Sequence, residues 1–146
     1  MNKRKILVAL LFVLPLLVVL VANSPAGVMV FDGEVTTYYP WMHLVSESNV
    51  GWCAPTAILL NYAVFALAVI YGLMKKEWCV KSIRNIAAIA GFLAVLPNLI
   101  QSDVMVIPNV FGAIALFADA VAAELLLRET ASVQKKAGGH DRLKQR

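Results

Sequence analysis

Charged residues are scarce in this sequence, and four long stretches lack them almost entirely. Only 15% of the residues are charged and 60% are hydrophobic, whereas soluble domains contain about 25% charged and about 45–50% apolar residues. The apolar residues form continuous runs, which favours a bilayer as the solvent over a water-soluble core. The sequence therefore predicts an all-α membrane protein, a bundle of four transmembrane helices with one long extracytoplasmic loop.

Cysteine is also scarce, because the chain has only Cys53 and Cys79 and no CxxC pair. This spacing indicates neither a redox pair nor a zinc site, so no metal and no cofactor is predicted. The two cysteines are expected at opposite faces of the membrane, whereas a disulfide needs Cα atoms within about 7 Å, so both are expected to be free. The cysteine pattern also lacks the pairs of membrane thiol oxidoreductases and of claudin-like proteins.

Four apolar runs define the predicted spans, at about residues 6–22, 54–74, 83–100 and 108–127, and each is close to the ~20 residues that cross a bilayer. They form a single membrane domain over residues 1–132, followed by a basic and disordered tail over residues 133–146. Residues 75–84 are expected to form a ten-residue basic turn, and residues 101–107 a tight connection.

The outer loop, residues 23–53, contains one candidate for regular structure. Asp32-Gly33 suits a two-residue type I′ turn, and the flanking residues from Val28 to Tyr39 are rich in β-branched and aromatic side chains, which predicts a β-hairpin. A short interfacial helix from Trp41 to Ser48 is a further expectation.

The first apolar run has two interpretations. A basic head followed by 17 uncharged residues resembles a secretory signal peptide, with a small-residue cleavage site at Ser24-Pro25-Ala26. However, the run exceeds the ~7–15 residues of a signal core, and three more spans follow. We therefore prefer an uncleaved first span and keep removal of residues 1–26 as the alternative.

Lysine and arginine are missing from every connection that is expected on one side of the membrane. Of the 13 Lys and Arg residues, three precede the first span, four lie between the second and third, and six follow the fourth. The positive-inside rule then predicts a multi-pass protein of the plasma membrane with both the N- and C-termini in the cytoplasm. Membrane orientation also accounts for the net charge of +4, so the expected partner is the lipid bilayer and no nucleic acid.

Asp119 is an acidic residue inside the fourth run. It lies roughly 16 Å along the helix from Pro108, close to the middle of a ~30 Å hydrocarbon core, where a carboxyl group must be neutralised, hydrogen-bonded or in contact with water. Gly112 and Ala122 fall on the same helix face, so Asp119 is expected to face a closely packed neighbour. One hypothesis is a proton- or cation-coupled site with Asn61 and Tyr71. The preferred one is a hydrogen bond from Asp119 to Asn61 or Tyr71 that fixes the packing.

Two further sets of residues have a simpler interpretation. Glu124 and Arg128 are spaced i,i+4 and predict an interfacial ion pair at the cytoplasmic boundary. His43 and Glu47 have the same spacing in the outer loop, but two ligands alone are a weak indication of a metal, and solvated side chains are preferred.

No Ser/His/Asp or Cys/His constellation and no glycine-rich phosphate loop is found in the sequence, so the chain is predicted not to be an enzyme. Small residues recur on the third and fourth runs at helical spacing, among them Ala87, Ala90 and Ala94. Such residues allow close helix contacts. The leading prediction is therefore a non-enzymatic accessory or oligomeric interaction protein, with a homo-oligomer or another membrane protein as partner. The alternative is a small transporter or channel that uses Asp119 as a proton- or cation-coupled site.

Overall fold

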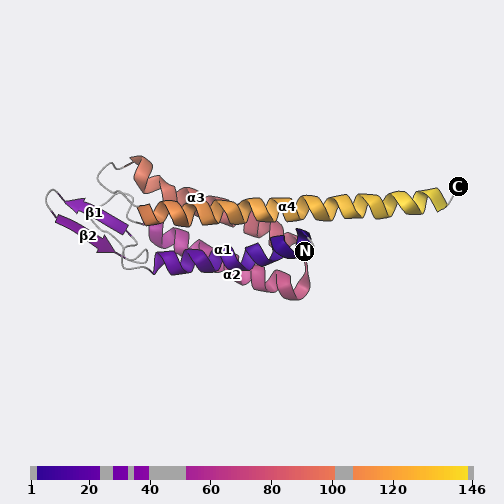
Figure 1. Ribbon diagram of the computed structural model, residues 1–146, viewed down its shortest axis with the longest axis horizontal. Helices are drawn as coiled ribbons and strands as arrows, with labels where there is room; N and C mark the ends of the chain where they lie inside the picture. Colours follow the sequence, from indigo (N-terminus) through magenta and orange to yellow (C-terminus); the bar gives the residue numbers. More distant parts are fainter. Residues whose placement is uncertain (1–2, 24–27, 33–34, 40–51, 101–106, 145–146) are drawn as a thin grey trace.

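The computed structural model describes residues 3–23, 28–32, 35–39, 52–100 and 107–144, with side chains for residues 3–23, 52–97, 99–100 and 110–133. It contains the helices α1 (Lys3–Ala22), α2 (Cys53–Met74), α3 (Glu77–Ile100) and α4 (Ile107–Lys144), and the strands β1 (Val28–Asp32) and β2 (Val35–Tyr39). Each of the four helices is long and apolar enough to cross a membrane. The predicted set of four such helices is therefore confirmed (Figure 1).

The four helices lie side by side as an antiparallel bundle (Figure 1). The main contacts join α1 to α2 and α4, and join α3 to α2 and α4. Consequently α2 and α4 occupy opposite corners of the bundle, as do α1 and α3.

The buried residues of α1 recur at helical spacing and lie on one face of the helix. On α1 the buried residues are Leu7, Leu11, Pro15, Val18 and Ala22, which recur at steps of three and four and so form one stripe. The opposite face of the same helix is exposed and equally apolar. A helix that is apolar all round suits an environment that is apolar on both sides.

Small residues bring α3 close to its neighbours. Ala87, Ala90 and Ala94 are fully buried in the core, and Gly91 faces the ring of Phe117 on α4. A Cβ atom added at Gly91 would lie 3.1 Å from Cε1 of that ring, which is closer than ordinary packing. The small residues for which the sequence predicted close helix contacts therefore contact other helices of the same chain.

The connection between α2 and α3 differs from the predicted ten-residue turn. α3 begins at Glu77, so only Lys75 and Lys76 separate the two helices. Lys75 adopts a left-handed conformation with φ of 53° and caps α2 by donating its N–H to the Tyr71 carbonyl, at 2.8 Å. The many charges of this segment hid the start of α3, in which Val80 and Ile83 are buried while Lys81 pairs with Glu77 on the exposed side, at 2.9 Å.

The fourth helix is longer than predicted. The sequence indicated that the span ends at Arg128 and that a disordered tail begins at residue 133, whereas α4 continues to Lys144. No proline follows Pro108 in this helix. Once a helix has formed, each added residue contributes one further backbone hydrogen bond, so the charged segment can continue the helix. The last part of α4 projects beyond the end of the bundle (Figure 1).

The strands β1 and β2 occupy the residues expected for the hairpin and pair antiparallel, in a register from Val28 opposite Tyr39 to Asp32 opposite Val35. They lie at the end of the bundle away from the C-terminus (Figure 1). Asp32 lies in β1 and pairs with Val35, so it is not one of the two residues between the strands, where the sequence had predicted it. Gly33, the helix expected from Trp41 to Ser48 and most of the connection after α3 lie outside the described residues.

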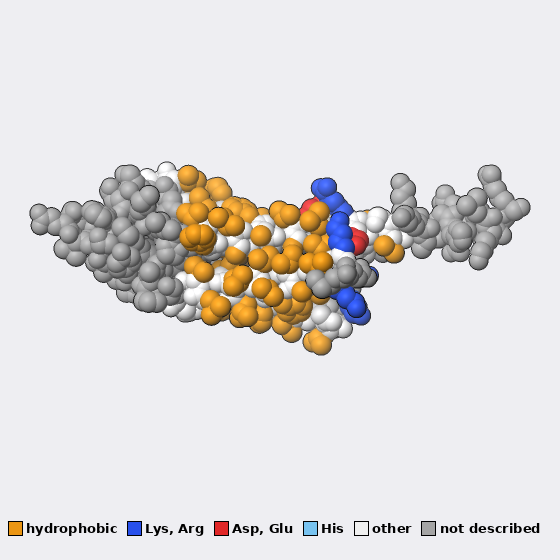
Figure 2. Space-filling model, viewed as in Figure 1, with side chains coloured by type: hydrophobic (Ala, Val, Ile, Leu, Met, Phe, Trp, Pro, Cys, Tyr) orange, Lys and Arg blue, Asp and Glu red, His pale blue; other side chains and the backbone are white. Residues whose placement is uncertain are grey.

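The described Lys and Arg side chains lie together at the other end of the bundle, as a band beside the apolar surface (Figure 2). This follows from the antiparallel order, which places the start of α1, the link between α2 and α3, and residue 128 of α4 at the same level. We call this the basic end; its members are Lys3, Arg4, Lys5, Lys75, Lys76, Lys81, Arg84 and Arg128.

Candidate functional site

Two apolar clusters fill the core and meet near the middle of the bundle. The cluster toward the basic end includes Leu11 and Val64, and the cluster toward the strands includes Val18 and Ile58. Each helix passes from one cluster to the other over one or two turns. The residues at this junction include Pro15 on α1, Asn61 on α2, Ala87 and Ala90 on α3, and Asp119 on α4.

Asn61 and Asp119 are the buried polar residues among the described side chains, with exposed fractions of 0% and 1%. Both lie at the junction between the clusters, since Asn61 falls between Ile58 and Val64 and Asp119 falls between Leu116 and Ala120. The prediction that Asp119 lies at middle depth and faces a helix neighbour is consistent with this position. We refer to Asn61, Asp119 and Pro15 as the polar layer.

Asn61 is held by the backbone of α1. Its Nδ2 atom donates a hydrogen bond to the carbonyl oxygen of Pro15, at 3.0 Å, while its Oδ1 atom has no partner among the described atoms. The missing N–H of Pro15 leaves the Leu11 carbonyl, four residues earlier, without its helix donor and does not by itself free the Pro15 carbonyl. A backbone carbonyl oxygen has two lone pairs, so the Pro15 carbonyl can accept from Asn61 in addition to its bond within the helix.

Asp119 is held by packing alone. Neither Oδ1 nor Oδ2 has a hydrogen-bond partner in the part of the chain that the structure describes. The hydrogen bond from Asp119 to Asn61 or Tyr71 that the sequence suggested is therefore not formed. The reason lies in the helix order: α2 and α4 are at opposite corners, and the Asn61 amide already donates to α1.

The two neighbours of α4 supply no side-chain donor at this level. α1 presents Pro15, and α3 presents Ala87 and Ala90. A buried carboxyl group without a hydrogen bond costs a few kcal/mol, and considerably more when it is charged. Buried polar groups of this kind are few in native structures, and each calls for an explanation, such as a catalytic role, a bound ion or a bound water molecule.

Tyr71 does not belong to the polar layer. It lies ten residues beyond Asn61 on α2, roughly 15 Å along the helix, and is buried in the cluster toward the basic end. Its ring also lines a groove between α1 and α2 at that end. The sequence placed Tyr71 near the end of the span but could not show which polar groups the fold brings to one level.

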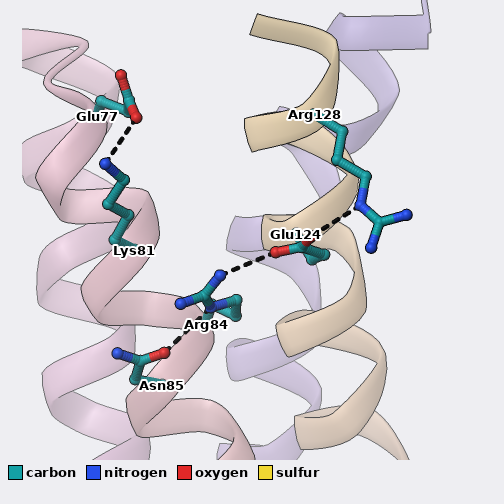
Figure 3. A network of polar contacts seen from close by, with 6 residues as sticks. All are labelled: Glu77, Lys81, Arg84, Asn85, Glu124 and Arg128. Atoms are coloured by element: carbon teal, nitrogen blue, oxygen red, sulfur yellow. Dashed lines mark hydrogen bonds and ion pairs between the residues drawn. The ribbon is translucent and has the colours of Figure 1, made fainter. Parts of the chain in front are cut away.

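The predicted ion pair at the end of the fourth span is present and is part of a larger network (Figure 3). The Arg128 Nε atom donates to Glu124 Oε1 at 2.7 Å, and Arg84 of α3 donates to Glu124 Oε2 at 2.9 Å. Arg84 also donates to Asn85 Oδ1 at 3.0 Å. Arg84 was missed as a partner, although the antiparallel order of α3 and α4 places Arg84 and Glu124 at the same end of the bundle.

The described residues offer no other constellation for chemistry. Among them no group of three or more His, Cys, Asp or Glu residues has the arrangement of a metal site. Cys53 and Cys79 are both free and buried. His43 and Glu47 lie outside the described residues.

The chain matches no protein-family model, no curated protein and no solved structure in the comparisons.

Proposed function

We propose that this chain is a non-enzymatic integral membrane protein that crosses the plasma membrane four times, with both termini in the cytoplasm. Large apolar side chains on the outside of the bundle support this, such as Leu20 and Leu73, with exposed fractions of 64% and 80%. α2 has 22 residues, about 33 Å, which fits a hydrocarbon core of about 30 Å. Trp52 and Trp78 are half-exposed at opposite ends of the bundle, where amphipathic rings meet the headgroups.

Within this frame we propose that the protein is a small transporter or channel that binds a proton at Asp119. The observation that carries the proposal is the position of both Asp119 oxygens, buried at mid-bundle without a partner among the described residues. An ionisable group inside a membrane span is costly and is retained for function more often than for stability.

A proton fits this site better than a metal cation. The unpaired acceptors of the described polar layer are the two Asp119 oxygens and Asn61 Oδ1, whereas hard cations take about six oxygen ligands. A single proton neutralises the carboxyl group and needs no coordination shell. Apolar residues surround the layer on both sides, which favours the neutral acid over the carboxylate.

Infrared spectroscopy of the full chain in liposomes tests the proposal directly. As the pH is stepped, we expect a carboxylic-acid C=O band that changes in intensity in the wild type and is lost in Asp119→Asn. Glu77→Gln is the matched control, since it makes the same change of carboxyl to amide at a half-exposed residue on the bundle surface, and it is expected to keep the band.

A flux measurement tests the transport step. In proteoliposomes under an imposed membrane potential, we expect proton uptake by the wild type and by Glu77→Gln, and none by Asp119→Asn. If no acid band assigned to Asp119 responds to pH and the flux is the same in all three proteins, the proton site is refuted.

The accessory or oligomeric role is the second candidate. α4 continues well past the bundle to Lys144 and has no described helix beside it there (Figure 1). A lone helix in water is marginally stable, so a partner protein or a second copy of the chain would stabilise this segment. Removal of residues 134–146 should then abolish crosslinking to that partner in native membranes. If the truncated chain keeps every crosslink of the wild type, and the wild type is only monomeric in mild detergent, this role is excluded.

A further inference from the structure

A groove of about 530 Å³ opens between α1 and α2 at the basic end. Its charged lining consists of Arg4, Lys5 and Lys75, and none of the described residues that line it is acidic. Its remaining walls are apolar and include Val8, Ala9 and Gly72. The groove therefore combines cations at one end with an apolar channel along the helices.

Two backbone features shape this groove. Lys75 has a left-handed conformation and ends α2, so the chain turns away there, and Lys75 is one of the residues that line the groove. Gly72 has no side chain, which lets Phe12 of α1 approach closely, because a Cβ atom at Gly72 would lie 3.1 Å from Phe12 Cζ. The two helices thus touch beside the groove without closing it.

Two of the three described acids at the basic end are paired with cations outside the groove, and the third, Glu129, is not among the residues that line it. Glu77 pairs with Lys81, and Glu124 pairs with Arg84 and Arg128. The lysines of the groove, Lys5 and Lys75, are both exposed. Lys5 and Lys75 are therefore placed to bind an anion in the groove.

We propose that this groove binds one anionic phospholipid, with the phosphate between Lys5 and Lys75 and an acyl chain along Val8, Ala9 and Gly72. The inference rests on the proposed membrane location, which places the basic end at headgroup level, and is independent of the proton site at Asp119. Basic pockets between transmembrane helices recognise anionic headgroups because cations meet the phosphate while the helix walls accept the chain.

Native mass spectrometry of the full chain tests this binding. The protein is released from nanodiscs that contain equal amounts of phosphatidylglycerol and phosphatidylcholine, and the retained lipid is identified. We expect the wild type to retain one phosphatidylglycerol in preference to phosphatidylcholine. Each lysine removed from the groove should lower this preference about fivefold, so Lys5→Ala/Lys75→Ala should lower it about 25-fold.

The chain offers a matched control for charge. Lys3 lies two residues before Lys5, and Lys76 directly follows Lys75; both are also exposed and do not line the groove. Lys3→Ala/Lys76→Ala removes the same charge from the same end of the bundle and is expected to keep the preference. Equal losses in the two double variants would mean a general surface attraction and would overturn the proposal.

A second pair of variants tests the apolar wall without changing charge. Ala9→Trp fills the groove, whereas Ala66→Trp adds the same ring to an exposed position of α2 outside it. Only Ala9→Trp should release the lipid.

Millimolar inorganic phosphate should not displace phosphatidylglycerol; displacement would assign the site to free phosphate instead. Retention of both lipids in equal amounts by the wild type would refute the lipid site, while the infrared test of Asp119 would be unaffected.

Discussion

Replacing Asp119 by alanine should leave the bundle as stable as the wild type or make it more stable. Asp119→Ala removes three heavy atoms from a core position but breaks no hydrogen bond with a described residue. An unsatisfied buried polar group costs about 1–3 kcal/mol, and this cost disappears in the variant. It offsets the packing contacts that are lost with the carboxyl group.

Leu116→Ala is the matched control for this prediction. Leu116 lies one turn earlier on α4, has an exposed fraction of 1% and also loses three heavy atoms on truncation to alanine. Its loss should cost about 2–5 kcal/mol, which corresponds to a decrease in Tm of about 5–15 °C. Asp119→Ala should stay within about 3 °C of the wild-type Tm or exceed it.

The two native cysteines provide the assay. Cys53 and Cys79 are free and buried, one near each end of the bundle, so a maleimide dye that fluoresces on reaction with thiols reports unfolding in mild detergent or nanodiscs. A Tm for Asp119→Ala as low as that for Leu116→Ala would show that the carboxyl group makes a stabilising contact. The packing role would then replace the proton site as the explanation of Asp119.

Three further substitutions test contacts elsewhere in the bundle with the same assay. Gly91→Ala and Phe117→Leu should be coupled, because a Cβ at Gly91 would lie 3.1 Å from the Phe117 ring: Gly91→Ala should be less favourable in the wild type than in the Phe117→Leu background, and purely additive effects would contradict the contact. Glu124→Gln should lower the Tm more than Glu77→Gln at low salt, because Glu124 holds two arginines on two helices, and the difference should shrink at high salt; equal changes would contradict the network. Asn61→Ala should cost about 1 kcal/mol through loss of the bond to the Pro15 carbonyl, and an unchanged Tm would show that this bond does not contribute.

The four helices were predictable from hydropathy because each apolar run is long enough to cross a bilayer. Their ends were less predictable. Residues 77–84 look like a solvated turn when their charges are counted, yet Val80 and Ile83 recur at helical spacing and are buried. Helical periodicity within a charged segment was therefore the better indicator, since charged side chains on the exposed face do not prevent a helix from starting.

The small residues on the third span show what a single sequence cannot resolve. Their spacing correctly indicated close helix contacts, but spacing does not say whether the neighbour belongs to the same chain. Ala87, Ala90 and Ala94 are buried inside the bundle. They therefore no longer support an external partner, and the case for an interaction role now depends on the extension of α4.

The polar layer was predictable in depth but not in connectivity. Hydropathy placed Asn61 and Asp119 inside their spans, and both are buried at the same junction. Pairing, however, depends on which helices are neighbours. The actual partner of Asn61 is the backbone carbonyl of Pro15, a group that every residue carries and that no side-chain pattern reveals.

The order of the helices explains why Asp119 is left without a partner. In a bundle where α4 contacts mainly α1 and α3, the helices beside Asp119 at its own level contribute the buried residues Pro15, Ala87 and Ala90. None of these side chains donates a hydrogen bond. The alanines that allow α3 and α4 to pack closely therefore offer the carboxyl group no hydrogen-bond donor. Its charge has to be neutralised by a species from outside the described residues. A proton is the smallest species that can do so.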